Sequence, residues 1–174
     1  GGPFAFANAL LSAEIAIQLG LEVQEILPGL NSLNGINGRF ESLPVTQEVS
    51  AIIDYAHTPS ALAKLLEGCR KIVAGRIILV FGCGGDRDSE KRPLMGEVAS
   101  MGADVNILTS DNPRSEDAQK IISEIASGMP VKPQVVEVDR QKAIEEAVDE
   151  AEPGDLIVIA GRGHEEYQEI QGKA

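Results

Sequence analysis

Five short apolar runs, each followed by a polar loop, constrain the fold of this chain more than any other feature. The runs occupy residues 49–55, 76–82, 104–109, 133–138 and 155–161. Runs of Ile, Val and Leu of this length are typical of strands that are buried on both faces of a sheet. Because helical segments alternate with them, the sequence predicts an α/β fold with right-handed crossovers and a doubly wound, mainly parallel sheet.

The segments between these runs are expected to be helices. They are 57–73, a helix that begins near Pro93, 115–128 and 140–151. Ser115 or Asp117 is a suitable N-cap for the third of them. The segment "YQEIQ", 167–171, could add an edge strand to the sheet.

Two further helices are expected before the first strand, at 5–19 and 22–33. The segment 34–39, "NGINGR", is a glycine and asparagine hinge and the natural domain boundary. The chain opens on glycine rather than on methionine, and both of its ends look cut. We therefore expect it to be part of a longer protein.

Composition limits the possible partners. The chain has 174 residues, of which 43% are hydrophobic, enough for one domain or a domain plus a fragment. A net charge of −12 argues against nucleic acid, because phosphate contacts need a basic face. Cys69 and Cys83 are too few for a disulfide scaffold and favour a cytoplasmic protein. No apolar run approaches the roughly 20 residues of a membrane span, so no membrane partner is expected.

Ligands of such sheets bind outside the carboxyl ends of the strands, so the loops that follow the strands are the places to search. Four of these loops are unusually polar. They are residues 54–59, 82–88, 111–114 and 161–166. Since parallel strands bring their carboxyl ends to one edge, the four loops are expected to form one site.

The loop "GCGGDRDSEKRP" is rich in glycine but matches neither G-x-x-x-x-G-K-[ST] nor G-x-G-x-x-G. Two interpretations remain open. The glycines could serve a turn with positive φ angles, or Arg87 could bind a carboxylate or phosphate with its fork of donors. Cys83 lies in the same loop, but no histidine neighbours it in sequence and Asp86 would raise its pKa, which disfavours a catalytic thiol.

The two histidines give weaker signals. His57 precedes Thr-Pro and suits a helix cap as well as a ligand contact. The "HEE" at 164–166 is not H-E-x-x-H, so its spacing excludes a zinc-hydrolase site. His164 is more typical of a hydrogen-bonded structural histidine, whereas Glu165 is suited to accept an ammonium group.

The stretch "TSDNPRSED" contains Asp111, Asn112, Pro113 and Arg114. Turn chemistry explains the first three, because Asp and Asn bond their own backbone and Pro fixes φ. Arg114 is left unexplained by the turn. Together with Arg87 and Glu165, it offers the charges that suit a zwitterionic amino acid.

The motifs "DYAHTP", "FGCGGDRDSEKRPLMG", "TSDNPRSED" and "AGRGHEEYQ", in this order, closely resemble the Mur ligase family. The resemblance covers nearly the whole chain and is strongest to members that add meso-diaminopimelate. It implies that residues 1–38 end a central ATP-binding domain and that 39–174 form a Rossmann-like, amino-acid-binding domain, truncated at its end. The family's first domain, its P-loop and its carbamylated lysine have no counterpart in this sequence.

The resemblance also implies site residues. Those for diaminopimelate are Arg87, Asp111, Asn112, Pro113, Arg114, Gly161 and Glu165. Those lining the ATP side of the cleft are Asn8, Arg39, Asp54 and His57. No metal ligand and no certain catalytic residue are expected in this part, and Arg162 stands where lysine is common in the family.

The activity implied is peptidoglycan precursor synthesis with ATP and Mg²⁺ in the complete enzyme. ATP phosphorylates the γ-carboxylate of the UDP-MurNAc-dipeptide, and the amine of diaminopimelate attacks the acyl phosphate. This part alone is expected to position the amino acid and to be inactive. Alternatives are a related ligase that adds lysine and a stand-alone Rossmann-like binding module. A dinucleotide-dependent oxidoreductase is opposed by the lack of a clear G-x-G-x-x-G.

Overall fold

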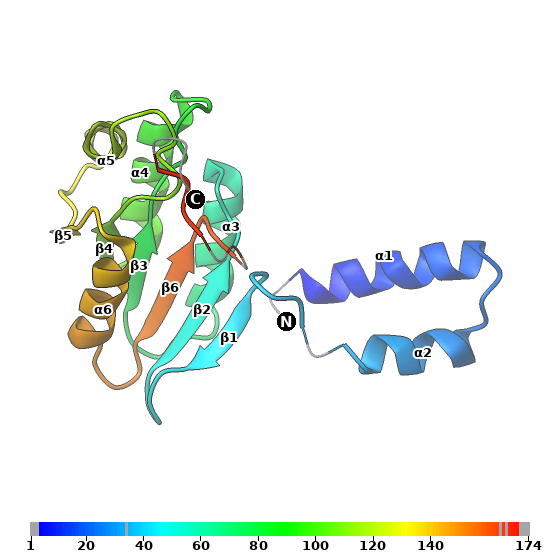
Figure 1. The fold of residues 1–174 in the computed structure, drawn as a ribbon. Coiled ribbons are helices and arrows are strands. Elements are labelled where there is room, and N and C mark those ends of the chain that lie inside the picture. Colours follow the sequence, from blue (N-terminus) through cyan, green and yellow to red (C-terminus); the bar gives the residue numbers. More distant parts are fainter. Residues whose placement is uncertain (1–3, 34, 164, 166, 171–174) are drawn as a thin grey trace.

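A six-stranded sheet forms the centre of the protein in the computed structural model, which describes residues 4–33, 35–163, 165 and 167–170 (Figure 1). The strands lie in the order β1-β2-β6-β3-β4-β5. Their bounds are β1 Glu41–Pro44, β2 Ser50–Asp54, β3 Ile77–Phe81, β4 Val105–Leu108, β5 Val135–Val136 and β6 Leu156–Ala160. All neighbours are parallel except β1, which pairs antiparallel with β2. The predicted fold class is confirmed.

Helices cover both faces of the sheet and bury two separate cores. Helices α3 (Pro59–Arg70), α4 (Lys91–Gly102) and α5 (Ala118–Ser127) pack on one face, and α6 (Arg140–Glu150) packs on the other. The central strand β3 is buried along its whole length. This burial on both faces explains why its sequence reads as an unbroken apolar run.

Local signals fix where two of the helices begin. Thr58 Oγ1 accepts a hydrogen bond from the backbone N of Ala61, and Pro59 occupies the first helical turn of α3. Asp117, rather than Ser115, caps α5 by accepting from the backbone N of Lys120 at 2.9 Å. The capping prediction is thus narrowed to Asp117.

The sheet edges differ from the expectation. Strand β1 was not predicted, because its four residues, "ESLP", alternate weakly and end in proline. Strand β5 is only two residues long where six were predicted. In the C-terminal segment, the described residues make a single parallel bridge between Ile170 and Arg114 instead of an edge strand.

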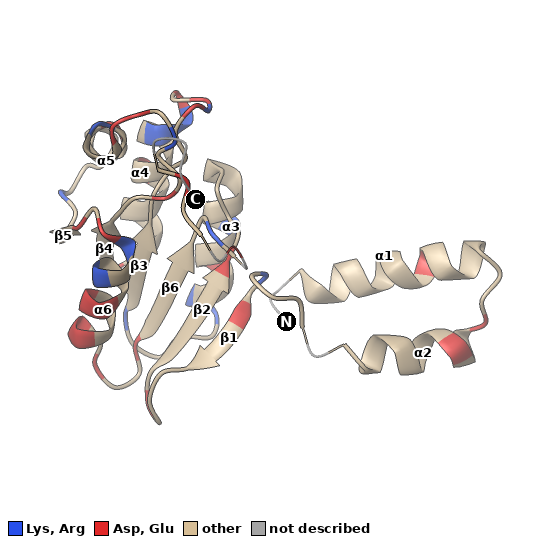
Figure 2. Cartoon of the chain, viewed as in Figure 1, with Lys and Arg blue, Asp and Glu red and all other residues tan. Residues whose placement is uncertain are grey.

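Helices α1 (Ala5–Gln18) and α2 (Val23–Asn31) form a hairpin that projects from the sheet (Figure 1). Neither helix buries a single side chain completely. Large apolar side chains are exposed along both, and Figure 2 shows that the pair carries few charges. The apolar surface of this hairpin is therefore uncovered in the chain as described.

The hinge that follows α2 is anchored at its end. Gly38 is buried; its backbone N donates to Glu41 Oε2 at 2.7 Å and its carbonyl accepts from the backbone N of Tyr55 at 3.0 Å. A Cβ built on Gly163 would lie 3.0 Å from the Cα of Gly38. Residue 38 is therefore packed against the loop that follows β6.

No helix in the described part of the chain is long and apolar enough to cross a membrane.

Candidate functional site

The four polar loops meet at one edge of the sheet, as predicted. They follow the carboxyl ends of β2, β3, β4 and β6, which are neighbours in the sheet (Figure 1). The loop after β6 is tied to the one after β2 by a hydrogen bond from the backbone N of Gly161 to the carbonyl of Asp54, at 3.1 Å. The loops are thus parts of one surface.

The loops after β3 and β4 lie backbone to backbone. A Cβ built on Gly82 would lie 2.2 Å from the carbonyl oxygen of Thr109, and one on Gly85 would lie 2.0 Å from that of Pro113. The backbone N of Gly85 donates to the carbonyl of Asn112 at 2.8 Å. The expectation that the glycines of this loop supply positive φ angles is wrong, because none of Gly82, Gly84 and Gly85 has one. At Gly82 and Gly85, glycine is needed because the two backbones approach too closely for a Cβ.

A buried arginine joins the same two loops from below. Arg92, in α4, has 1% of its side chain exposed and pairs with Glu116 at 2.8 Å and Glu124 at 2.5 Å. Glu116 also accepts from the backbone N of Asp86 at 2.6 Å. The hydrogen bond from Arg92, followed by that from Asp86, lowers the pKa of Glu116 to about 2.

Asp86 adds a second contact between these loops. It has a positive φ of 52° and accepts from Ser115 Oγ at 2.6 Å. The hydrogen bonds from the Ser115 side chain and backbone lower the pKa of the Asp86 carboxyl. The conformation of the loop that carries Arg87 is therefore set by residues of the other loop.

Arg114 has contacts that turn chemistry did not predict. Its φ is 52°, in the left-handed region, and 22% of its side chain is exposed. Nη1 donates to the carbonyl of Gly85 at 2.8 Å, and Nε lies 3.3 Å from Glu169 Oε2. Arg114 thus links the loop after β3 to the C-terminal segment while part of its side chain stays exposed.

Residues 167–170 lie along residues 110–114. Gln168 Nε2 donates to the carbonyl of Asp111 at 2.6 Å, and the backbone N of Glu169 donates to Asn112 Oδ1 at 2.7 Å. The backbone N of Arg114 in turn donates to the carbonyl of Glu169 at 3.0 Å. We call residues 167–170 the strap, because they hold the turn from the outside.

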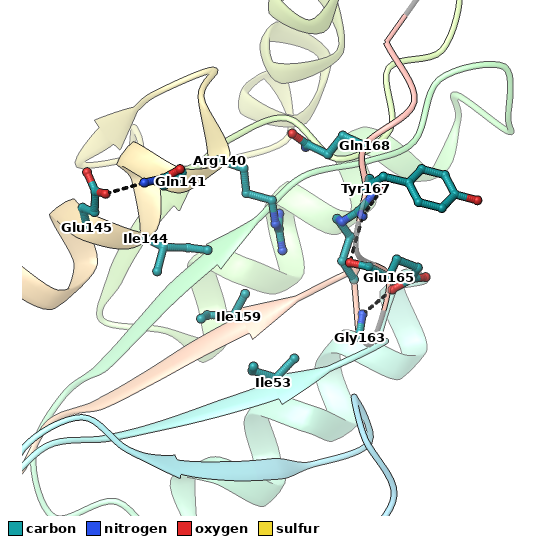
Figure 3. Close-up of a pocket in the computed structure, with 11 residues that line it drawn as sticks. Ile53, Arg140, Gln141, Ile144, Glu145, Ile159, Gly163, Glu165, Tyr167 and Gln168 are labelled. Atoms are coloured by element: carbon teal, nitrogen blue, oxygen red, sulfur yellow. Dashed lines mark hydrogen bonds between the residues drawn. The ribbon is translucent and has the colours of Figure 1, made fainter. Parts of the chain in front are cut away.

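Acidic groups complete the edge. Asp111 is 6% exposed, and a Cβ on Gly161 (φ 98°) would lie 2.8 Å from its Oδ2. Glu165 Oε2 accepts from the backbone N of Gly163 at 2.7 Å. Glu165 lines a groove of about 610 Å³. Figure 3 shows it among the other residues that line this groove. Its lining runs from β2 and β6 to the start of α6 and the strap.

Arg140 supports the edge from inside the same groove. It is 8% exposed and donates to the carbonyls of Ser110 at 3.4 Å and Ala160 at 3.0 Å, the residues that precede Asp111 and Gly161. Burial lowers the pKa of its guanidinium to about 10, so it stays cationic at neutral pH.

Arg87 lies at the exposed rim of the same edge. Its Nη1 donates only to the carbonyl of Asp86, at 3.0 Å, within the described residues. A Cβ built on Gly84 would lie 3.0 Å from Arg114 Nη1 and 3.9 Å from Arg87 Cγ, so the two arginines flank one glycine. The structure therefore brings together the predicted diaminopimelate residues.

Three of the residues predicted for the ATP side also cluster. The Arg39 guanidinium lies 4.6 Å from the centre of the Tyr55 ring, and the His57 ring lies 4.7 Å from it on edge. Asp54 accepts from the backbone N of Phe40 and of Ala56, both at 2.8 Å. Asn8 is separate from them, because it is exposed on the projecting helix α1.

Cys83 is buried beneath the loop, and burial raises the pKa of its thiol to about 11. The negative charge that adds to this effect is Asp111, not Asp86 as expected from sequence. We predict that Cys83 in the folded chain reacts with iodoacetamide at pH 8 roughly 100-fold more slowly than in urea, because only the thiolate reacts. Mass spectrometry of the alkylated peptides measures this, and equal rates would contradict the burial.

Sequence reasoning missed the supporting residues Arg92, Glu116, Arg140 and Gln168, and it treated Arg162 only as a departure from the family pattern. Two of them had a weak signal in the sequence. Arg92 lies at the start of a predicted helix, and Arg140 directly follows Asp139, a suitable N-cap. No group of three metal-binding side chains occurs among the described residues. His164 and Glu166 lie outside the described residues. The edge offers a set of groups that suits an amino acid. These are the guanidinium groups of Arg87 and Arg114, the carboxylates of Asp111 and Glu165, and the side-chain amide of Asn112, which Glu169 holds in place.

Comparison with known proteins adds a family to this geometry. Residues 38–163 match the family described as Mur ligase, glutamate ligase domain. A UDP-N-acetylmuramoyl-L-alanyl-D-glutamate–2,6-diaminopimelate ligase from Gloeobacter violaceus is 47% identical over 169 residues, 96% of this chain and 35% of that protein. A protein of the same name from Clostridioides difficile is 45% identical, over 97% of this chain and 35% of its own length. The chain spans about a third of the length of these relatives.

Solved structures agree. One of a UDP-N-acetylmuramoyl-L-alanyl-D-glutamate–2,6-diaminopimelate ligase superposes with a TM-score of 0.75 at 40% identity, over 99% of this chain and 36% of that one. The MurF ligase of Thermotoga maritima in complex with ADP has a TM-score of 0.68 at 19% identity, over 92% of this chain and 35% of that one, which shows the shared fold alone. By the family match over its sheet domain and by this similarity over nearly its whole length, the chain belongs to the Mur ligase family.

Proposed function

We propose that this chain is the amino-acid-binding part of an ATP-dependent ligase that joins meso-diaminopimelate to UDP-N-acetylmuramoyl-L-alanyl-D-glutamate. The observation that carries this proposal is the pair of guanidinium groups, Arg87 and Arg114, on a loop edge that also presents Asp111 and Glu165. Diaminopimelate has two carboxylates and two amines. The two relatives described above, which match nearly the whole of this chain, are both named as 2,6-diaminopimelate ligases.

Each proposed role follows from the charge that the residue offers. Arg87 and Arg114 bind carboxylate, and Glu165 or Asp111 binds the ammonium group that does not react. The remaining amine attacks the acyl carbonyl carbon, the C–O bond to phosphate breaks, and the amide forms with loss of a proton. The loops contribute by holding that amine in place, since positioning alone lowers the barrier substantially.

Lysine is the natural competitor for this site. It lacks the second carboxylate and would leave one guanidinium without its partner. A site with polar groups rejects a ligand that cannot pair with them far better than an apolar pocket does. The edge therefore favours diaminopimelate over lysine.

Nucleotide and metal are assigned mainly to other parts of the enzyme. Structures that share only the fold include one in complex with ADP and one with AMPPNP and Mn ion. We propose ATP and Mg²⁺ for the complete enzyme, where they supply the phosphoryl group that activates the γ-carboxylate. These 174 residues contain no G-x-x-x-x-G-K-[ST] motif, so we propose that alone they bind the amino acid without catalysing its addition. Arg39, Asp54, His57 and Asn8 are the proposed residues on the ATP side.

The projecting hairpin fits this division of labour. We propose that residues 1–38 belong to the ATP-binding domain and that 39–174 form the amino-acid-binding domain. The exposed apolar side chains of α1 and α2, among them Phe6, Leu11 and Leu19, would then be covered by the rest of the ATP-binding domain.

Arg87→Ala in the complete enzyme tests the proposal. Because Arg87 is exposed and bonds only its own loop within the described residues, its loss spares the fold. We expect KM for diaminopimelate to rise about 10-fold or more, as a charged hydrogen bond is worth this much, and KM for ATP to stay unchanged. Arg70→Ala, which removes an exposed ion pair at the opposite end of the sheet, is the matched control and should change neither value. The reverse pattern in the two KM values would rule the assignment out.

A further inference from the structure

The side-chain amide of Asn112 is held in one orientation by two donors. Its Oδ1 accepts from Arg162 Nη1 at 2.8 Å and from the backbone N of Glu169 at 2.7 Å. A guanidinium and a backbone N–H can only donate, so the atom they meet has to be the amide oxygen. The amide nitrogen Nδ2 therefore points away from both, and it donates to none of the residues that the structure describes.

Arg162 is suited to this contact by its shape and its burial. It is 7% exposed, and besides Asn112 its guanidinium donates to the carbonyls of Glu165, at 3.3 Å, and Tyr167. One planar fork thus reaches three acceptors on two segments of the chain. An ammonium group is a single point of charge and does not span them in the same way.

We propose that Arg162 is a positioning residue for the amino-acid substrate. By bonding Oδ1 of Asn112, it leaves Nδ2 as the only polar group of that side chain that faces the ligand. Nδ2 then donates to a carboxylate oxygen of the incoming amino acid. If the amide turned over, its oxygen would face that carboxylate and repel it. An amide fixed before binding also loses no rotational freedom when the ligand arrives. This inference rests on the proposed function.

The proposal separates Arg162 from the residues that touch substrate. Its guanidinium donates to Asn112, Glu165 and Tyr167, and Asn112 is the one of the three that it meets through a side chain. The proposal therefore places its effect in the orientation of Asn112, and a double-mutant cycle separates this route from one through Glu165 or Tyr167. Asn112→Asp should keep the local geometry, because a carboxylate oxygen still accepts from Arg162 and Glu169. It loses the donor on the ligand side and adds a negative charge there.

The test is a double-mutant cycle in the complete enzyme with KM for diaminopimelate as the readout. We expect Arg162→Ala and Asn112→Ala each to raise this KM about 10-fold, and the double variant to match Asn112→Ala alone, because the two changes remove one interaction. Asn112→Asp should raise KM at least as much as Asn112→Ala while the melting temperature stays near that of the wild type. KM for ATP should not move in any of them.

Several outcomes would overturn the inference. Effects that multiply to about 100-fold in the double variant would show that Arg162 acts independently of Asn112. Normal diaminopimelate binding in Asn112→Asp would show that Nδ2 is not the donor. Arg76→Ala is the control for general destabilisation, since it breaks the 2.7 Å ion pair with Asp155 at the opposite end of the sheet; a raised KM there would also overturn it. A wild-type enzyme that forms no product from diaminopimelate would instead refute the proposed function, and the inference with it.

Discussion

Arg114→Ala in the complete enzyme should lower kcat/KM for diaminopimelate about 100-fold. The variant loses the proposed pairing between Arg114 and a substrate carboxylate, and truncating one partner of such a desolvated charge pair costs at least roughly 2–3 kcal/mol. The structure adds a reason beyond the lost carboxylate contact. Nη1 of Arg114 also holds the carbonyl of Gly85, so the loop that carries Arg87 loosens when Arg114 is shortened. KM for ATP should remain within about twofold of the wild-type value.

Two companion variants separate the causes. Arg114→Gly relieves any strain at the φ of 52°, because glycine adopts positive φ freely. If Arg114→Gly loses as much activity as Arg114→Ala, the lost side chain is responsible. Arg114→Lys keeps the charge without the fork and should lie between wild type and alanine. Full activity in Arg114→Lys would contradict a bidentate contact between the Arg114 guanidinium and a substrate carboxylate.

Arg92→Ala should cost about 3 kcal/mol of unfolding free energy, since removing one partner of a buried ion pair is strongly destabilising. The same change leaves a void beside α4, because the Arg92 side chain that filled this space is only 1% exposed. For a domain of this size the melting temperature should fall by roughly 6–12 °C. Thermal unfolding followed by far-ultraviolet circular dichroism measures the shift. A shift as small as that of the exposed control Arg70→Ala would contradict the role assigned to Arg92.

The same ion pair sets a pH window for stability. Folding lowers the pKa of Glu116 from 4.5 to about 2, so its ionised form stabilises the fold at every pH above the higher value. This contribution is lost as the pH falls from 4.5 towards 2. In Arg92→Ala the largest cause of the shift is gone, so its loss of stability across this window should be shallower than that of the wild type. Equal slopes would show that other carboxyls dominate.

The sheet was predictable because its signal is repeated. Each inner strand is an apolar run that a helix follows, and such a pattern permits few other arrangements. Strand β1 escaped notice because four residues at an edge bury little and carry little pattern. Strand β5 was overestimated because it lies at the edge of the sheet, where only Val135 and Val136 pair with β4, and because Pro133 has no backbone N–H to donate.

The site was predictable as a set of charges but not as a set of contacts. The sequence places Asp111, Asn112 and Arg114 after one strand and Glu165 after another, and the topology then brings them to one edge. It does not show that Arg162 reaches Asn112 across 50 positions, because such a contact depends on the path of the strap. Long-range polar contacts leave no periodic trace in the sequence.

The strap has a consequence for attempts to exchange amino-acid selectivity between ligases of this family. Residues 110–114 are bonded along their length to residues 167–170, both through side chains and through the backbone. The unit that we propose to select the amino acid is therefore discontinuous, and it spans two segments that are distant in the chain. A graft of the Asp-Asn-Pro-Arg turn alone would arrive without the groups that orient it. A transplant that carries the segment from Gly161 to Ile170 together with the turn would move the recognition surface as one piece.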